Sequence, residues 1–215
     1  MIEIKNKEDC CGCTACVAVC PKNCIEMKED IEGFKYPQVD TNECIQCNKC
    51  HNVCPIKSPC KQIDKPVEIY FVQSVDEAIR ESSTSGGMFT ALAEHIVSNN
   101  GIVFGATFKD DDLWQVIHTS GEDKTEIEKF RGSKYVQSDM GNCFALVKRN
   151  LIENRQVLFS GTPCQIAGLK KFLTKDYSNL ITVDVVCRAV PSPFVWRKYV
   201  ELFKNKYGNS IERFK

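Results

Sequence analysis

Cys10-Cys11-Gly12-Cys13-Thr14-Ala15-Cys16-Val17-Ala18-Val19-Cys20-Pro21 is the stretch of sequence that decides the N-terminal fold. Four of its cysteines follow the spacing C-x2-C-x2-C-x3-C, and a proline comes directly after the fourth. The same spacing returns 34 residues later at Cys44, Cys47, Cys50 and Cys54, again followed by a proline. A repeat of this kind indicates an internal duplication of one structural unit.

The spacing of these eight cysteines is typical of two [4Fe–4S] clusters. Three cysteines at two-residue gaps can hold three corners of a cubane, and the fourth cysteine of each run reaches across to the other cluster. The predicted ligand sets are Cys10, Cys13, Cys16 and Cys54 for one cluster, and Cys44, Cys47, Cys50 and Cys20 for the other. A zinc ribbon would instead use two C-x2-C pairs. The chemistry expected of two such clusters is electron transfer.

Three further cysteines of this region, Cys11, Cys24 and Cys60, lie outside the spacing. We interpret Cys11 and Cys24 as small buried or spare thiols. The role of Cys60, near the end of the region, stays open.

The composition of the whole chain limits the classes of protein to which it can belong. Of 215 residues 43% are hydrophobic and 14 are Cys, while Lys plus Arg equals Asp plus Glu. A net charge of zero gives no sign of a nucleic-acid or membrane-surface partner. No apolar run reaches the roughly 18–20 residues of a membrane span, and residues 1–9 lack the apolar core of a signal peptide. We therefore expect a cytoplasmic protein, whose thiols stay reduced and bind metal.

The chain divides into two regions of different chemistry. Residues 1–60 form the predicted two-cluster domain, residues 61–67 predict a linker, and residues 68–215 alternate between strand-like and helix-like patterns. The expected strands are 68–73, 101–108, 114–119, 157–160 and 180–187. The expected helices are 86–99, 139–154, one that begins at Pro163, and 193–206. This predicts an α+β fold, in which the ferredoxin module precedes an α/β domain with a mixed sheet.

Two loops of the second region carry candidate binding groups. The loop Ser82-Ser83-Thr84-Ser85-Gly86-Gly87 precedes a helix, and its hydroxyls and amides suit either a phosphate or plain helix capping. The loop Ser160-Gly161-Thr162-Pro163-Cys164-Gln165 places Cys164 in the first turn of a helix, where the pKa of a thiol is lowered. Cys164 is thus a redox thiol, a cluster ligand, a residue under a cofactor or a small buried side chain. The sequence has no G-x-G-x-x-G or G-x4-G-K-[ST], so a Rossmann turn or P-loop is not predicted.

Four segments of the second region resemble a known family. They are Ser85-Gly86-Gly87-Met88-Phe89-Thr90-Ala91-Leu92, Gly132-Ser133-Lys134-Tyr135-Val136-Gln137-Ser138, residues 157–169 and Val190-Pro191-Ser192-Pro193. In this order they are similar to the family of coenzyme F-420 hydrogenase/dehydrogenase beta subunits, from about residue 68 to the end. Residues 1–60 resemble the bacterial two-cluster ferredoxin domain, which implies short hairpins and two short helices.

The resemblance implies an FAD-dependent oxidoreductase that exchanges hydride with a small two-electron partner, such as the deazaflavin coenzyme, and single electrons with the clusters. It places the flavin against Ser85, Gly86, Gly87, Gly132, Ser133, Lys134, Gly161, Thr162, Pro163, Cys164 and Gln165. Lys134 would stabilise negative charge on the reduced flavin, and Cys164 and Lys134 are the candidate catalytic residues. In some relatives a further cluster is bound in this domain, with Cys60, Cys143, Cys164 and Cys187 as the candidates here.

The sequence departs from the family at two places. Many relatives read Val-Cys-His-Gly-Val-Pro where this chain reads Val186-Cys187-Arg188-Ala189-Val190-Pro191, so a role tied to that histidine is not expected here. Relatives also continue well beyond residues 211–215, which look like the start of a strand. We therefore expect an incomplete C-terminus and an incomplete flavin site.

The leading hypothesis is an iron–sulfur flavoprotein oxidoreductase whose partners are a hydrogenase, dehydrogenase or ferredoxin and a small hydride donor or acceptor. The alternative is a pure electron carrier, in which the second domain docks a partner and binds no flavin. A redox-sensing regulator is a weaker alternative, because the sequence carries no nucleic-acid-binding motif.

Overall fold

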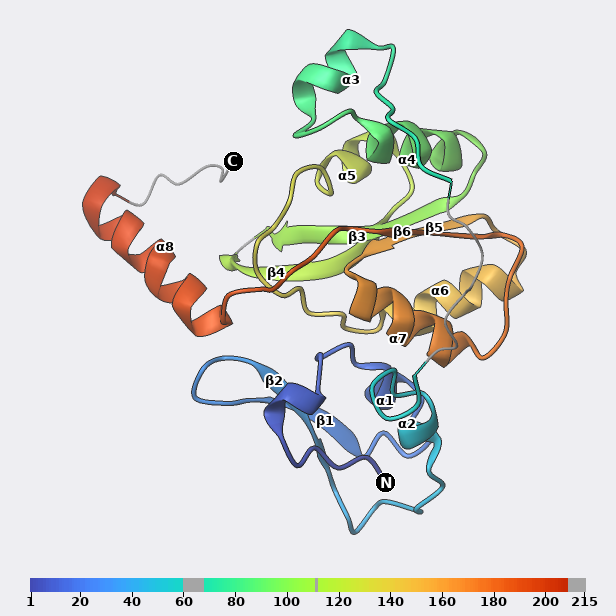
Figure 1. Ribbon diagram of the computed structural model, residues 1–215, viewed down its shortest axis with the longest axis vertical. Helices are drawn as coiled ribbons and strands as arrows, with labels where there is room; N and C mark the ends of the chain where they lie inside the picture. The colour runs from blue at the N-terminus through green and yellow to red at the C-terminus, as the bar shows by residue number, and fades with distance from the viewer. Residues whose placement is uncertain (60–67, 111, 209–215) are drawn as a thin grey trace.

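The computed structural model describes residues 1–59, 68–110 and 112–208 (Figure 1). The elements, in chain order, are η1 Lys7–Asp9, α1 Ala15–Ala18, β1 Ile25–Glu29, β2 Lys35–Val39, α2 Lys49–Asn52, α3 Glu77–Ser82, α4 Met88–Ser98, β3 Ile102–Lys109, β4 Asp112–Gly121, α5 Lys124–Glu128, α6 Cys143–Ile152, β5 Val157–Gly161, α7 Pro163–Leu173, β6 Leu180–Asp184 and α8 Pro193–Tyr207. The predicted linker, 61–67, and Cys60 lie outside the described residues.

The N-terminal region consists of an antiparallel hairpin and two short helices. Strands β1 and β2 pair with Ile25 opposite Val39. Their turn is closed by the Asp30 carboxylate, which accepts from the amides of Glu32 and Phe34. Helices α1 and α2 occupy equivalent places in the duplicated sequence, because each begins five residues after the first cysteine of its run. The hairpin and paired helices agree with the predicted ferredoxin fold.

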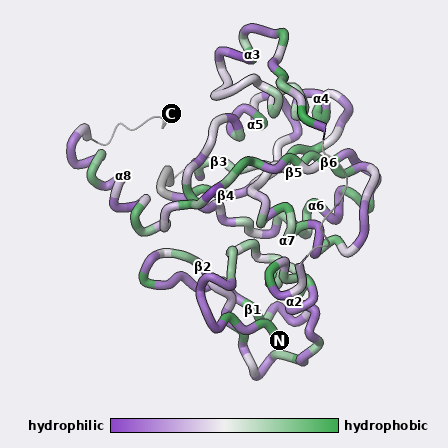
Figure 2. Tube along the Cα trace, in the orientation of Figure 1, coloured by the Kyte–Doolittle hydropathy of each residue, from purple (hydrophilic) through white to green (hydrophobic). Residues whose placement is uncertain are grey.

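The second region is built on a four-stranded sheet in the order β4-β3-β5-β6. β4 runs antiparallel to β3, whereas β3, β5 and β6 are parallel to one another. The sheet is therefore mixed, as predicted. β3 and β5 occupy its centre and are the most uniformly buried strands, since their sequences are nearly continuous apolar runs (Figure 2).

Helices cover both faces of this sheet (Figure 1). On one side α4 packs on β3 and β5, and α5 packs on β4. On the other side α6 packs on β3, β4 and β5, and α7 packs on β5 and β6. Phe104, Phe144 and Phe159 are almost completely buried between the sheet and α6, and their rings contact one another. The N-terminal region lies against the α6 and α7 side, where α1 contacts both helices.

One hydrophobic cluster joins the two regions. It contains Cys13, Ala15 and Val53 from the N-terminal region, and Phe144 and Leu169 from α6 and α7. Two ion pairs lie at its edges, Lys35 with Asp139 and Arg197 with Glu29. Apolar packing and not charge is thus the main contact between the regions, because both ion pairs are largely exposed.

The structure differs from three sequence predictions. Residues 68–73 form no strand, and Ile69 and Phe71 are 92% and 99% exposed, so this apolar run has no sheet partner in the described residues. The helix predicted from Asp139 begins only at Cys143, because Asp139 pairs with β4 through backbone hydrogen bonds to Val116 and His118. β6 ends at Asp184, and Cys187 therefore lies beyond the sheet.

Candidate functional site: two thiol-lined cavities beside an α/β loop cluster

Both cysteine loops have the same backbone conformation. Gly12 and Thr14 of the first loop have φ of +64° and +63°, and Gln46 and Asn48, 34 residues later, have +53° and +57°. These left-handed residues curl each loop directly before α1 and α2 begin. Because left-handed Thr and Gln are uncommon, the shared conformation points to a structural demand that both loops meet.

The first cavity is lined by Cys10, Cys13, Cys16 and Cys54, with Cys11 beside them. Cys54 comes from the second run, so this cavity takes its fourth thiol from the other loop. Burial raises the pKa of Cys16 to about 12, with the neighbouring Cys10 as the next cause. Burial likewise raises the pKa of Cys10. Thiolates here therefore need a cationic centre to offset their lost hydration.

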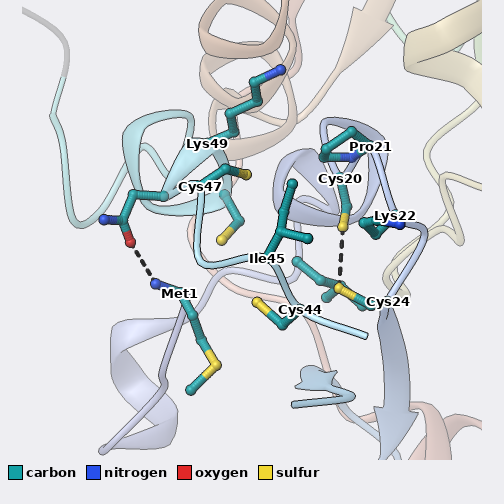
Figure 3. Close-up of a pocket in the computed structure, with 12 residues that line it drawn as sticks. Met1, Cys20, Pro21, Lys22, Cys24, Cys44, Ile45, Cys47 and Lys49 are labelled. Atoms are coloured by element: carbon teal, nitrogen blue, oxygen red, sulfur yellow. Dashed lines mark hydrogen bonds between the residues drawn. The ribbon is translucent and has the colours of Figure 1, made fainter. Parts of the chain in front are cut away.

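The second cavity repeats this arrangement with Cys44, Cys47, Cys50 and Cys20 (Figure 3). Its space, including the part open to solvent, is about 320 Å³, against about 330 Å³ for the first. Cys24 also reaches it, and its Sγ lies 3.4 Å from the Sγ of Cys20. Among the described residues, no three His, Cys, Asp or Glu side chains converge on a single-ion site. Each quartet instead surrounds a cavity.

The loop before α4 leaves the start of that helix without a side-chain cap. Gly87, the N-cap residue, has φ +80°, and no side chain in the described part of the chain caps the first amides of α4. Gly86 lies so close to the carbonyl of Val72 that an added Cβ would come within 2.5 Å of it. Ser85 is exposed at this helix end. The loop thus presents free amides and a hydroxyl, the groups that an anion binds.

The segment Gly132–Lys134 lies near this loop. Arg131 donates to the Ser82 hydroxyl at 2.6 Å, which ties the end of α3 to the segment. Gly132, with φ +76°, and Ser133 are exposed. The Lys134 ammonium donates to the carbonyls of Lys129 and Arg131, at 2.8 and 2.9 Å. Lys134 therefore stabilises the end of α5 in this structure.

The third predicted segment starts α7 through a capping box. The Gln165 Oε1 accepts from the amide of Thr162 at 2.9 Å, and Pro163 occupies the first helical position. The Gln165 Nε2 donates to the Ser138 hydroxyl at 2.9 Å. Ser138 and Gln165 thus join the second predicted segment to the third, and Arg131, directly before the second segment, ties it to Ser82 of the first.

A buried histidine completes this hydrogen-bond chain, and sequence patterns gave no signal for it. His118 Nε2 is 2.9 Å from the Ser160 carbonyl and must donate to it, so Nδ1 accepts from the Ser138 hydroxyl at 2.7 Å. Burial lowers the pKa of His118 to about 4, and the ring stacks on Phe159. The neutral histidine fixes the position of Ser138 and, through it, of Gln165.

The cysteines proposed for a further cluster lie in different surroundings. Cys143 is buried and donates to the carbonyl of His118 at 3.2 Å. The Cys164 Sγ is 3.1 Å from the Thr162 hydroxyl. The neighbouring Cys11 thiol and burial raise the pKa of Cys164, so the lowered pKa predicted for the start of this helix is wrong. Cys187 is exposed, with its Sγ 3.9 Å from the carbonyl of Ala189. The described contacts bring none of these three together.

Comparisons with known proteins agree with this architecture. Residues 9–58 match the family described as 4Fe-4S dicluster domain, residues 69–144 match the N-terminal part of the coenzyme F420 hydrogenase/dehydrogenase beta subunit, and residues 154–215 match its C terminus. In the residues that the structure describes, no helix has the length and apolar character of a membrane span.

Individual relatives are similar over most of this chain. Coenzyme F420-dependent sulfite reductase of Methanocaldococcus jannaschii is 28% identical over 171 residues, 79% of this chain and 26% of that protein. One of the subunits of the F(420)H(2) dehydrogenase of Methanosarcina mazei is 23% identical and is matched over 76% of this chain and 48% of that protein.

A solved structure shares the fold. It is the F420-reducing [NiFe] hydrogenase complex from Methanosarcina barkeri, at a TM-score of 0.53 and 22% identity, over 72% of this chain and 57% of that chain. This chain spans about half or less of the two curated relatives named above. It is an iron–sulfur protein that belongs to the family of coenzyme F420 hydrogenase/dehydrogenase beta subunits and carries a 4Fe-4S dicluster domain at its N-terminal end.

Proposed function

We propose that this chain is an electron-transfer module in which two [4Fe–4S] clusters exchange single electrons with a flavin, FAD, held by the second region. The observation that carries the proposal is the pair of cavities, since the lining of each includes the first three spaced thiols of one run and the fourth thiol of the other. Such crossed sets are the ligand pattern of two-cluster ferredoxins. The reduced thiols that this requires fit the cytoplasm.

The residues fit two cubanes by number, chemistry and placement. Each cavity offers the four thiols of its quartet and one further thiol, Cys11 or Cys24, and its walls are apolar, with Ile56 at one cavity and Ile45 at the other. Apolar walls exclude water, and backbone amides of the left-handed loops would donate hydrogen bonds to a bound cluster, which would raise its potential. The chain would thus tune each cluster by its own backbone.

The proposed flavin site uses the three joined segments. The uncapped start of α4, with Ser85, Gly86 and Gly87, would hold the diphosphate. Gly132 and Ser133 would lie beside it, and Gly161 to Gln165 would form the wall nearest the first cluster loop. Bound FAD supplies the conversion between one hydride and two single electrons. The hydride partner, a deazaflavin or another small molecule, and a hydrogenase- or dehydrogenase-type redox partner are proposed from the named relatives.

We propose that Lys134 and Cys164 act on the flavin only after their side chains move, because both make contacts with other residues in this structure. Lys134 holds two carbonyls at the end of α5, and Cys164 faces Cys11. The alternative function, a carrier without flavin, keeps the clusters and leaves these residues structural.

Anaerobic purification followed by iron, sulfide and flavin analysis tests the proposal. We expect about eight irons, eight sulfides and one acid-released FAD per chain. Iron without FAD would favour the carrier, whereas zinc or metal-free protein would overturn both functions.

The crossed assignment has a sharper test in single variants. Cys54→Ala should disturb the same cluster signal in electron paramagnetic resonance as Cys10→Ala, and Cys20→Ala the same signal as Cys44→Ala. Cys143→Ala, outside both quartets, is the control and should leave both signals unchanged. If Cys54→Ala and Cys44→Ala affect one and the same cluster, the ligand sets are not crossed.

The proposed diphosphate site can be tested by placing a negative charge at the start of α4. Ser85→Asp adds a negative charge at the start of α4 and should lower FAD affinity at least tenfold, while the neutral, similarly shaped Ser85→Asn should change it little. Equal FAD affinity in both variants would place the diphosphate elsewhere.

A further inference from the structure

The two cysteine loops occupy equivalent places in the duplication but have different neighbours. Cys13 of the first loop is 7% exposed, and Gly168 of α7 lies so close to it that an added Cβ would come within 2.9 Å of the Cys13 Sγ. The counterpart of Cys13, 34 residues later, is Cys47, which is exposed. The α/β region therefore covers the first loop, whereas the equivalent place on the second loop is open among the described residues.

Other equivalent positions of the duplication differ in the same way. Ala15 is fully buried in the hydrophobic cluster that joins the two regions. Its counterpart Lys49, at the start of α2, is exposed. Likewise Ile56, which lines the first cavity, corresponds to Lys22, which lines the second. Where the first copy of the unit has Ala and Ile, the second has lysines, so the two copies present faces of different charge.

The second cavity is bordered by positive charge. Of the described residues that line it, only Lys22 and Lys49 have charged side chains (Figure 3). Both are exposed, and neither forms an ion pair with another described residue. The acids Glu26 and Glu43, near in sequence, do not line the cavity. The described lining of the first cavity contains no charged side chain at all.

An exposed apolar side chain accompanies the two lysines. Ile45 lines the same cavity and is 58% exposed. We call Lys22, Ile45, Cys47 and Lys49 together the cationic patch. An apolar centre with cations at its rim is complementary to a partner surface that has acids at its own rim. Interfaces between electron-transfer partners are among the smallest known, so a patch of this size can serve one.

We propose that the cationic patch docks a redox protein whose own iron–sulfur centre lies beneath an acidic face. The first quartet packs on α7 through Cys13, and the second quartet opens at the patch. The patch is therefore the place where the N-terminal region meets a partner, as the first loop meets the α/β region.

The role of this docking rests on the proposed function, because it adds the place at which electrons enter or leave the chain. Docking would bring the partner's iron–sulfur centre next to Cys47. One electron would pass between that centre and the site of the second quartet, so that one side is oxidised by one electron and the other is reduced by one. No bond forms and no proton is transferred.

The test measures binding directly, with a small, acidic [2Fe–2S] ferredoxin of the plant type as the probe. The whole chain, purified anaerobically with its metal content intact, is titrated with the oxidised ferredoxin in a calorimeter at ~20 mM and ~300 mM salt. We expect binding at low salt that weakens about tenfold at high salt, because salt screens charges at an exposed interface. The net charge of this chain is zero, so its overall charge predicts no such attraction.

Matched variants locate the contact. Lys22→Glu and Lys49→Glu should each weaken ferredoxin binding about tenfold at low salt, and by less at high salt. Lys206→Glu, near the end of α8, changes the net charge equally and should bind like the wild type. Absence of binding to the wild type, or equal affinity in all three variants, would overturn the proposal. Lysine-dependent binding to phosphatidylserine vesicles without binding of ferredoxin would also overturn it, in favour of a membrane surface.

Carbodiimide cross-linking checks the same contact, because it joins a lysine ammonium to a carboxylate that lies against it. We expect ferredoxin peptides joined to peptides that contain Lys22 or Lys49, whereas cross-links confined to the second region would overturn the proposal.

Iron, sulfide and flavin contents of the same samples separate this inference from the proposed function. A chain without clusters that still binds ferredoxin through Lys22 and Lys49 would overturn the proposed function and leave the docking site standing. A chain with both clusters whose ferredoxin binding does not depend on these lysines would overturn the docking site and leave the proposed function standing.

Discussion

Close contacts of single residues hold the proposed cluster sites against the α/β region. Gly168 shows this most directly, since an added Cβ would come within 2.9 Å of both the Cβ and the Sγ of Cys13. His118 acts within the α/β region, where its neutral ring holds Ser138 and, through Ser138, Gln165 at the start of α7. No sequence pattern indicates this role for His118, because its hydrogen-bond partners are 20 and 42 residues away along the chain.

Gly168→Ala should therefore displace Cys13 and lower cluster occupancy. We expect the variant to lose iron from the cluster bound by the first quartet while the second quartet retains its own, measured by iron analysis and paramagnetic resonance. Lys170→Ala, an exposed position on the same helix, is the control. Full iron content in Gly168→Ala would show that α7 and the first loop can move apart at little cost.

The buried His118 predicts a pH dependence of stability. Its pKa lies at about 4 in the folded chain against 6.5 in the unfolded chain, so the unfolded state binds the proton first as the pH falls. Stability is full above pH 6.5 and is lost between pH 6.5 and 4. From pH 7.5 to 5.5 the wild type should lose about 1 kcal/mol more than His118→Gln in urea unfolding. Equal losses in both proteins would contradict a neutral buried His118.

At the scale of elements, hydrophobic runs predicted the central strands of the sheet. The short helices α3 and α5 were not predicted. β3 and β5 are predictable because they are almost wholly apolar, and α7 because Thr162 and Pro163 indicate its start. Residues 68–73 have the same apolar character, yet a strand also needs a partner, which sequence pattern does not supply.

The two helices that sequence analysis missed are short. α5 has a signal that could have revealed it, since Asp123 caps the amide of Glu126 and the Glu126 carboxylate accepts from the amide of Glu122. α3 likewise begins with Asp76, whose side chain accepts from two amides. With five and six residues, neither shows the repeating apolar positions of a longer helix.

Gln165 links the start of α7 to Ser138, so replacing Gln165 should remove a hydrogen bond from each of them. Gln165→Ala leaves the Thr162 amide and the Ser138 hydroxyl without that partner, and we expect it to destabilise the chain by about 1–3 kcal/mol. The exposed Gln156→Ala should stay within about 0.5 kcal/mol of the wild type. Urea unfolding of both variants measures the difference, and similar values would assign Gln165 no structural role.

At the scale of the whole molecule, apolar packing unites the two regions. The cysteine spacing predicted the chemistry of the first region, and the family motifs predicted the second, but neither predicted how they meet. The contact depends on Cys13, Ala15 and Val53 fitting between α6 and α7, and no local pattern records such a long-range fit.

Val53→Ala should accordingly cost about 1–3 kcal/mol, because it leaves a cavity in the shared cluster. Lys35→Met, which removes an exposed ion pair between the regions, should cost less than about 1 kcal/mol. The two variants are compared by anaerobic thermal unfolding. A larger effect of Lys35→Met would mean that charge, and not packing, holds the regions together.

The exchange of one thiol between the two cysteine loops bears on how the protein matures. A nascent chain that has emerged only as far as Cys20 offers three thiols to one cavity and a single thiol to the other, so neither site is complete. Both become complete when synthesis passes Cys54. Neither cubane should therefore be completed in this protein until the second cysteine loop has been synthesised.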